Sequence, residues 1–235
     1  MKVSVIIPSY NEIKTLPQVL EKISALPLDL EIIAVDDGSK DGTLEWLEKA
    51  KASGQYPRLS KVLAHSSNFG KGAALRTGFA AASGEIIVIQ DADLEYNPDC
   101  IPQLVKPIEE GRAEIVYGSR MLSKESGTYS IIYLLGNKFV TWVANTLCGG
   151  KFTDSYTCYK AFKSDIVKNM NLISSGFEIE GEISAIVALR KYKFLEIPVT
   201  YIPRSRAEGK KINWKDAVKG IITIIRTCRR EKNRT

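Results

Sequence analysis

Two hydrophobic periods alternate along the first half of the chain. Short, continuously apolar runs are typical of buried β-strands, and they occur at residues 2–8, 30–35, 61–66 and 84–90. Segments with apolar residues three or four positions apart are typical of helices, and they occur at 13–23, 41–53 and 72–83. This alternation predicts an α/β fold with a mostly parallel sheet that helices cover on both faces.

The second half of the chain is less regular. We expect strands at 113–120 and 194–202, a helix at 177–193, and an amphipathic helix with a basic tail at 214–235. Pro198 indicates that the last strand lies at an edge or a bulge. The apolar, aromatic segment 129–148 fits either a core helix or a helix at a membrane interface. Since no repeat or linker is visible, we expect one domain over residues 1–216 and a basic, amphipathic extension over 217–235.

Polar clusters follow three of the predicted strands. Asn11 and Glu12 follow the first strand, Asp36 and Asp37 follow the second, and residues 91–95 follow the fourth. Open α/β sheets bind their ligands at the carboxyl ends of parallel strands. The three clusters therefore predict one binding site at that edge of the sheet.

The carboxylates Asp91, Asp93 and Glu95 are two residues apart, so in extended chain they would point to one side. Like charges at short distance raise each other's pKa, so such a group needs a positive partner. Carboxylate oxygens suit a hard cation such as Mg²⁺ or Mn²⁺, held together with substrate phosphates. The alternative is a solvated acidic turn before a helix. We favour a metal site because the group directly follows a buried strand.

The turn after the second strand offers contacts to a nucleotide. Asp36 and Asp37 can accept hydrogen bonds from a ribose or from the N–H groups of a base. The alternative is that this turn caps the following helix through Ser39 or Asp41, and both roles can coexist.

A glycine-rich segment opens the predicted helix at 72–83. It can bind phosphate, with Lys71 and Arg76 as contacts to the nucleotide, although it lacks the P-loop spacing. Close packing of a helix rich in small residues on the sheet explains Gly72 and Gly78 equally well.

The charge balance refines this picture only a little. The net charge is +6 and the pI is about 9.0, which suits an acidic ligand or an anionic membrane surface and does not require nucleic acid. His65 is the only histidine, so neither a Ser-His-Asp triad nor a zinc site has adequate residues. We expect His65 to be structural.

The cysteines and the chain start bear on the compartment. Four cysteines, at positions 100, 148, 158 and 228, form no CxxC pair, and we expect them to be free thiols in a reducing cytoplasm. The first residues lack the apolar core of a signal peptide, and no apolar run approaches the roughly 20 residues that cross a bilayer. We therefore expect the protein on the cytoplasmic side.

The ordered set of motifs resembles glycosyltransferase family 2. The resemblance is carried by VIIPSYNE, VDDGSKDGT, NFGKGAALRTGFAAASGEIIVIQDADLEYNP, YGSR, DSYTCYKAF, GFEIEGEI and RSRAEGKKINWKD, which cover about residues 3–216. Within the family, the chain looks like the dolichyl-phosphate mannose or glucose synthase branch. This implies the GT-A fold, a Rossmann-like, mostly parallel sheet flanked by helices, of the nucleotide-diphospho-sugar transferase type.

The resemblance also implies which residues bind the donor and the metal. With the contacts suggested above, the expected nucleotide-sugar-binding residues are Pro8, Tyr10, Glu12, Asp36, Asp37, Lys71, Arg76, Asp91 and Ala92. Asp93 and Glu95 match the protein ligands of a divalent cation, Mg²⁺ or Mn²⁺, while Asp91 would lie against the donor. Glu95 stands where this branch often has glutamine, which leaves the metal preference open.

Basic residues match the phosphate-binding positions of the family. Arg120 and Arg204 would bind the donor diphosphate and the acceptor phosphate, and with Asp91 they are the expected catalytic residues. Lys210 or Lys211 would assist at the acceptor phosphate. The segment RSRAEGKK departs from the RSxxGxSK of some members, so the choice between the two lysines stays open.

The expected activity is metal-dependent, inverting transfer of mannose or glucose from GDP-mannose or UDP-glucose to a polyprenyl (dolichyl) phosphate, at the cytoplasmic face of a membrane. A phosphate monoester is already anionic near pH 7 and needs no general base. The alternative is transfer to a saccharide or protein hydroxyl, with Glu178, Glu180 or Glu182 as the base. A non-catalytic nucleotide-sugar or lipid-binding module is the third hypothesis.

Overall fold

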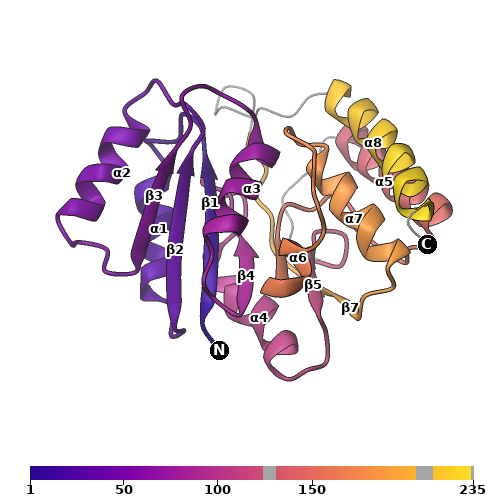
Figure 1. The fold of residues 1–235 in the computed structure, drawn as a ribbon, viewed down its shortest axis with the longest axis horizontal. Coiled ribbons are helices and arrows are strands. Elements are labelled where there is room, and N and C mark those ends of the chain that lie inside the picture. The colour runs from indigo at the N-terminus through magenta and orange to yellow at the C-terminus, as the bar shows by residue number, and fades with distance from the viewer. Residues whose placement is uncertain (124–130, 205–213, 234–235) are drawn as a thin grey trace.

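A seven-stranded sheet forms the centre of the computed structural model, which describes residues 1–123, 131–204 and 214–233 (Figure 1). The strands are β1 (Val3–Ser9), β2 (Leu30–Asp36), β3 (Leu59–Ala64), β4 (Ile86–Ile89), β5 (Ile115–Ser119), β6 (Lys160–Lys163) and β7 (Phe194–Pro198). The helices are α1 (Leu16–Ala25), α2 (Thr43–Ala52), α3 (Lys71–Ala81), α4 (Ile101–Glu109), α5 (Ile131–Cys148), α6 (Ser164–Lys168), α7 (Ile179–Leu189) and α8 (Trp214–Lys232), with a 3₁₀ turn at Pro98–Cys100.

The sheet has the strand order β3-β2-β1-β4-β6-β5-β7, and only β6 runs antiparallel to its neighbours. This confirms the mostly parallel sheet that the sequence predicts. Pro198 ends β7, which is an edge strand as expected. The reversed strand β6 was not among the predicted strands, because its four residues give no periodicity of their own.

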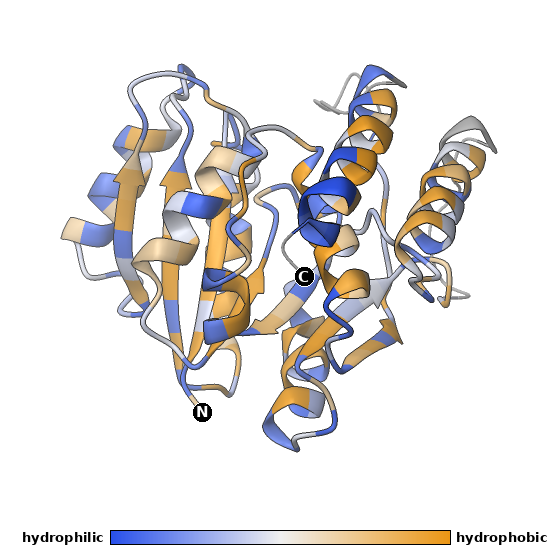
Figure 2. Cartoon of the chain, turned by 45° about the vertical axis from the view of Figure 1, so that its right-hand side comes forward, coloured by the Kyte–Doolittle hydropathy of each residue, from blue (hydrophilic) through white to orange (hydrophobic). Residues whose placement is uncertain are grey.

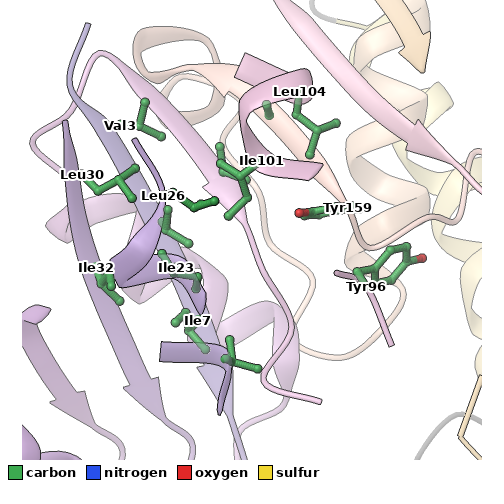
Figure 3. Packing of buried hydrophobic residues seen from close by; sticks show 14 of the residues in the cluster. Val3, Ile7, Ile23, Leu26, Leu30, Ile32, Tyr96, Ile101, Leu104 and Tyr159 are labelled. Atoms are coloured by element: carbon green, nitrogen blue, oxygen red, sulfur yellow. The ribbon is translucent and has the colours of Figure 1, made fainter. Parts of the chain in front are cut away.

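Two hydrophobic clusters lie on opposite faces of the sheet. Alternate residues of β1 divide between them: Val3, Val5 and Ile7 pack with α1, α2 and α4, whereas Ile6 packs with α3, α6 and α7. Figure 3 shows part of the first cluster, where Ile23 of α1 and Ile101 of α4 lie with sheet residues such as Val3 and Ile7. Every residue of β1 and β2 except Pro8 is buried, which explains their continuous apolar runs.

Helix α3 packs unusually closely on the sheet. A Cβ at Gly78 would lie 2.3 Å from the side chain of Ile6 in β1, so only glycine fits there. At the other end of the helix, a Cβ at Gly72 would lie 2.5 Å from the carbonyl oxygen of Ser174. Close packing on the sheet, one of the two explanations offered for these glycines, therefore accounts for Gly78, whereas Gly72 allows the helix to approach the loop at Ser174.

Helices α5, α7 and α8 form a third layer at one end of the molecule, where α8 packs along α7 and α5 (Figure 1). Helix α8 begins at Trp214, just before the predicted boundary at 216, and continues through most of the predicted extension. In the part of the chain that the structure describes, no helix is both long and apolar enough to span a bilayer.

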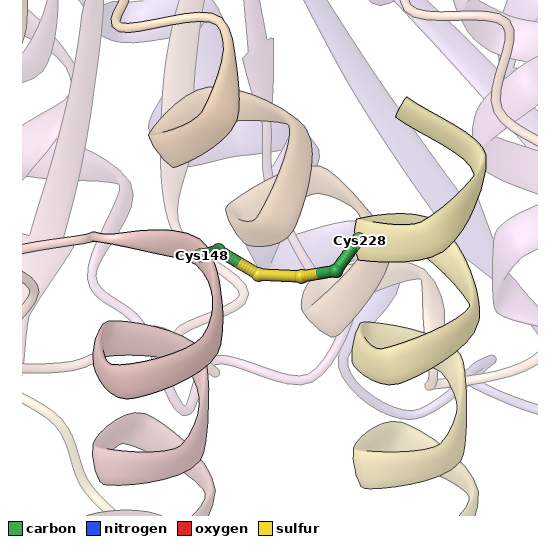
Figure 4. The surroundings of a disulfide bond; sticks show 2 residues. All are labelled: Cys148 and Cys228. Carbon is green, nitrogen blue, oxygen red and sulfur yellow. A yellow bond between two sulfur atoms is a disulfide. The ribbon is translucent and has the colours of Figure 1, made fainter. Parts of the chain in front are cut away.

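Cys148 of α5 and Cys228 of α8 form a disulfide (Figure 4), so the expectation of four free thiols is wrong for this pair. Cys100 and Cys158 are free. The two bonded cysteines are 80 residues apart in sequence, and only the packing of α5 on α8 brings their Cα atoms to 6.2 Å. Because disulfides persist mainly in oxidising compartments, the cysteine content no longer supports a reducing one.

At the amino end of the sheet, Glu31 of β2 is 4% exposed and accepts hydrogen bonds from the backbone N–H of Ser83 at 2.6 Å and its hydroxyl at 2.7 Å. Ser4 donates to the same carboxylate, and Lys2 Nζ lies 3.0 Å from it. Burial alone would raise the pKa of Glu31, but these donors outweigh burial and lower the pKa to about 2. The ionised carboxylate therefore stabilises the fold.

Glu31→Gln is expected to lower the free energy of unfolding by about 3 kcal/mol at pH 7 and by much less at pH 3. The pKa is lowered in the folded state, so this stabilisation is complete above the ordinary pKa of 4.5 and is lost as the pH falls towards 2. Denaturant unfolding at both pH values measures it, with the exposed Glu21→Gln as control. An equal loss at both pH values would contradict this assignment.

Candidate active site

The acidic segment after β4 lies at the carboxyl ends of the parallel strands, and its charges have direct partners. The segment turns, with Leu94 at a φ of 60°, so it does not continue as the extended chain expected from the sequence. Asp91 Oδ1 lies 2.6 Å from Lys71 Nζ, at the first residue of α3. The positive partner of Asp91 is therefore Lys71, which the sequence interpretation had assigned to the nucleotide.

Arg204 links the ends of β1 and β4. Its Nη1 and Nη2 donate to the two carboxylate oxygens of Glu12 at 3.0 and 3.2 Å, and its Nη2 also donates to Asp93 Oδ2 at 2.7 Å. The backbone N–H of Arg204 donates to Glu95 Oε1 at 2.7 Å. One arginine therefore contacts three of the predicted site carboxylates.

Asp93 has a strongly perturbed carboxyl group. Burial raises its pKa, the neighbouring charges of Asp91 and Glu95 raise it further, and Arg204 only partly opposes them, so the pKa is about 7. The site therefore holds more negative charge than its arginine balances.

Arg120, at the end of β5, is held by a buried carboxylate. Its Nε and Nη2 donate to Asp154 at 2.7 and 2.8 Å, and its guanidinium lies 5.3 Å from the ring centre of Tyr201. Tyr201 in turn donates to Glu95 Oε2 at 2.8 Å. Tyr201 thus connects Arg120 to the acidic segment, and neither Tyr201 nor Asp154 was singled out from the sequence.

The two aspartates at the carboxyl end of β2 differ in their surroundings. Asp37 accepts from the backbone N–H groups of Phe69 and Gly70 at 3.0 and 2.7 Å, and it lies 2.7 Å from His65 Nδ1. Asp37 thus fixes the loop that opens α3, and His65 has the structural role expected of it. Asp36 is fully buried and accepts from the Ser39 N–H through Oδ2, while its Oδ1 has no hydrogen-bond partner within the described residues.

The other predicted donor-binding residues are only partly gathered at this edge. The carbonyl oxygen of Ala92 accepts from Thr15 Oγ1 at 2.7 Å, which ties the acidic segment to the start of α1. Pro8 and Tyr10 lie at the end of β1, beside Glu12. Arg76 points to Ser175, with Nη2 and Oγ 3.5 Å apart. Lys210 and Lys211 lie outside the described residues.

The three glutamates proposed as alternative bases have other partners. Glu182 accepts from the backbone N–H groups of Ile173 and Ser174 and from Arg230, and its exposed fraction is 0%. Glu180, 1% exposed, forms an ion pair with Lys160. Glu178 accepts from the backbone N–H of Gly176 at 2.9 Å. Each of these carboxylates is therefore already engaged by a cation or a backbone N–H group.

The residues present fit a divalent cation that a substrate completes. Asp93 and Glu95 offer hard oxygen ligands, and the raised pKa of Asp93 shows unbalanced negative charge beside them. Within the described residues, no group of three or more His, Cys, Asp or Glu could hold a metal by itself. This matches Mg²⁺ sites that use one or two carboxylates together with substrate phosphates.

Comparison with known proteins agrees with this geometry. The model of the family described as Glycosyl transferase family 2 matches residues 4–168. A dolichol-phosphate mannosyltransferase of Pyrococcus furiosus is 33% identical over 227 residues, which covers 89% of this chain and 59% of that protein. An undecaprenyl-phosphate mannosyltransferase of Micrococcus luteus is 27% identical over 220 residues, covering 89% of this chain and 87% of that protein. The chain thus spans about three fifths of the Pyrococcus relative.

The fold is also that of solved glycosyltransferases. Glucosyl-3-phosphoglycerate synthase of Mycobacterium tuberculosis, in complex with Mn²⁺, UDP-glucose and phosphoglyceric acid, superposes with a TM-score of 0.70 at 22% identity, covering 97% of this chain and 79% of that one. This likeness confirms the GT-A arrangement of sheet and helices. The match of the family model over most of the chain identifies this protein as a member of glycosyl transferase family 2.

Proposed function

We propose that this protein transfers a hexose from a nucleotide-sugar to a polyprenyl phosphate, with a divalent cation and inversion at the anomeric carbon. Both curated relatives described above bear the names of polyprenyl-phosphate mannosyltransferases. The proposal extends that activity to this chain.

The observation that carries the proposal is the contrast between arginines and glutamates. Arg204 and Arg120 lie at the acidic segment, directly and through Tyr201, whereas in α7 Glu182 is bound by Arg230 and Glu180 is paired with Lys160 and Lys71. A hydroxyl acceptor requires a base near the reacting oxygen. A phosphate acceptor is already anionic and instead requires cationic groups that bring two negatively charged reactants together.

Each group of residues has a proposed task. Asp36 and Asp37 lie on the side of the nucleoside, and Asp91 lies against the donor sugar. Asp93 and Glu95 would hold a divalent cation, which when bound stabilises the charge of the departing nucleoside diphosphate. Arg204 and Arg120 orient the acceptor phosphate, whose oxygen attacks the anomeric carbon in a single displacement that inverts its configuration.

The donor is proposed to be GDP-mannose rather than UDP-glucose. The names of both relatives specify mannose, and no residue contact within the described chain distinguishes the two sugars by itself.

A transfer assay tests the proposal. The protein is incubated with Mn²⁺ and radiolabelled GDP-mannose or UDP-glucose, in parallel with polyprenyl phosphate and with the free polyprenol. Labelled lipid from the phosphate alone is expected. Product from the free alcohol would favour the hydroxyl acceptor, and binding without any transfer would favour a non-catalytic module.

A membrane surface is part of the proposal, because the acceptor is a lipid. Helix α5 exposes Leu135, Phe139 and Trp142 by 60, 54 and 60%, and α8 exposes Val218 and Ile222 by 46 and 42%. Figure 2 shows that α8 also carries a hydrophilic C-terminal end. Exposed basic residues accompany this face, namely Lys138, Lys215, Lys219, Arg226 and Arg229. An apolar face flanked by positive charge favours docking to an anionic bilayer, proposed here to be its cytoplasmic leaflet.

The double variant Phe139→Ser/Trp142→Ser is expected to weaken binding to anionic vesicles about tenfold or more, since two exposed rings no longer enter the lipid. Co-sedimentation with vesicles containing phosphatidylserine measures it. Ile173→Ser removes an equally exposed apolar side chain outside α5 and α8 and is the control. Equal binding by both variants would count against docking through α5.

A further inference from the structure

Four charged side chains form a continuous buried chain that ends at the active site. Asp91 Oδ1 lies 2.6 Å from Lys71 Nζ, Lys71 Nζ lies 3.5 Å from Glu180 Oε1, and Glu180 Oε2 forms an ion pair with Lys160 Nζ. The four residues come from four elements: the end of β4, the first residue of α3, the first turn of α7 and the first residue of β6. The chain therefore crosses the interior behind the acidic segment.

This row of four charged side chains is deeply buried, and its charges alternate in sign. The side chain of Lys160 is 0% exposed, Glu180 is 1% exposed and Lys71 is 8% exposed. Two positive and two negative groups leave no net charge among the four. Because a buried charge is strongly unfavourable without a partner, each member keeps the next one in place.

The fold by itself does not require these charges. A buried ion pair can often be replaced by apolar residues of similar volume without loss of stability, so its presence calls for another explanation. Lys160 is anchored further, since its Nζ also donates to the carbonyl oxygen of Thr157 and lies 4.6 Å from the ring centre of Tyr117. Lys160 is thus the rigid end of this row of charged side chains, and Asp91 is the end that faces the site.

Lys71 stays charged in this environment. Burial alone would lower the pKa of Lys71, but the charges of Asp91 and Glu180 outweigh burial and raise it well above its usual value. An ammonium group held in this way can orient the Asp91 carboxylate throughout the working pH range.

We propose that Lys160 and Glu180 are positioning residues of the active site: Lys160 holds Glu180, and Glu180 holds Lys71 against Asp91, so that the Asp91 carboxylate is oriented before the donor binds. This inference rests on the proposed function only in that Asp91 is taken to lie against the donor. It assigns Lys71 to Asp91 rather than to the nucleotide, and it gives Glu180 a role other than that of a base.

A double-mutant cycle with Glu180→Gln and Lys160→Met tests the proposal. Loss of a fixed orientation at a reacting centre costs about 10- to 100-fold in kcat. We expect a loss of this size in Glu180→Gln and a smaller loss in Lys160→Met. Because Lys160 acts through Glu180, adding Lys160→Met to Glu180→Gln is expected to change kcat less than twofold further.

The same set of variants distinguishes a loss of activity from a failure to fold. Either single variant unbalances the buried charges by one and can fail to fold, whereas the double variant removes both charges of the pair and is expected to fold. Glu31→Gln is the matched control, since it neutralises another buried glutamate at the opposite end of the sheet. We expect it to lower stability and to leave kcat of the folded protein unchanged.

A binding measurement separates this inference from the proposed function. Calorimetry of GDP-mannose with Mn²⁺ needs no acceptor, and Glu180→Gln and the double variant are expected to weaken that binding about three- to tenfold while Glu31→Gln does not. If the wild-type protein binds donor but glycosylates no polyprenyl phosphate, the proposed function fails. The donor affinities of the variants still test the positioning role of Lys160 and Glu180.

Three results would overturn the inference. The first is binding and kcat of the double variant within twofold of Glu31→Gln. The second is independent, multiplicative losses from Lys160→Met and Glu180→Gln. The third is a complete loss of activity in Glu180→Gln, together with loss of the acidic limb of its pH–rate profile, while Lys160→Met behaves as wild type. This combination would make Glu180 a general base.

Discussion

Asp93→Asn is expected to lower kcat about 10³-fold, the largest effect of any single substitution considered. The amide removes one of the two proposed anionic ligands of the cation, and with it most of the stabilisation of the leaving diphosphate. The fold should persist, because burial and the charges of Asp91 and Glu95 already raise the pKa of Asp93 to about 7, so its ionised form is unfavourable in the folded protein. Initial rates at saturating Mn²⁺ and donor measure the loss.

Asp99→Asn is the matched control for this substitution. Asp99 follows the acidic segment by a few residues, its side chain is 59% exposed, and its ion-pair partner Lys22 lies 3.6 Å away. We expect its rate to stay within twofold of wild type. A rate for Asp93→Asn that is close to that of Asp99→Asn would mean that Asp93 is no metal ligand.

Arg204→Lys is expected to lower kcat/KM for polyprenyl phosphate about 100-fold. The guanidinium contacts both oxygens of Glu12 and Asp93 Oδ2 at once, and a lysine ammonium on a flexible stem cannot reproduce this planar, multidentate geometry. The same geometry suits a phosphate, so the loss should appear mainly with the acceptor. Kinetics with the acceptor and the donor varied in turn measure both constants.

Arg190→Lys is the control for replacing an arginine by a lysine as such. Arg190 follows the C-terminal end of α7, far along the helix from Glu180, and its Nε donates to Glu231 at 2.7 Å. Its replacement should leave both constants unchanged. If Arg204→Lys retains kcat/KM within threefold of wild type, Arg204 has no role in binding phosphate.

The sheet and the edge that carries the site could be predicted from the sequence, because burial on both faces leaves a continuous apolar run. Strands β1, β2 and β4 have this pattern, and each one is followed by one of the predicted polar clusters. Since the carboxyl ends of parallel strands meet at one edge, the meeting of Glu12 with Asp93 through Arg204 follows from the strand order.

The partners of these residues could not be predicted in the same way. Arg204 lies 111 positions from Asp93, and Lys160 lies 20 positions from Glu180, so their pairing depends on where β6, β7 and α7 pack. The hydrophobic periodicity of a short segment does not indicate such long-range contacts. The disulfide between Cys148 and Cys228 was missed for the same reason, because it depends on the packing of α5 on α8.

Calorimetric titration of Mn²⁺ into the protein with GDP present, at pH 8 where Asp93 is ionised, tests the central claim most directly. Saturable uptake by wild type and Asp99→Asn is predicted, together with no detectable uptake by Asp93→Asn and weaker uptake by wild type at pH 6. Identical heats for wild type and Asp93→Asn, or no uptake by wild type, would contradict a cation bound between the acidic segment and a donor diphosphate.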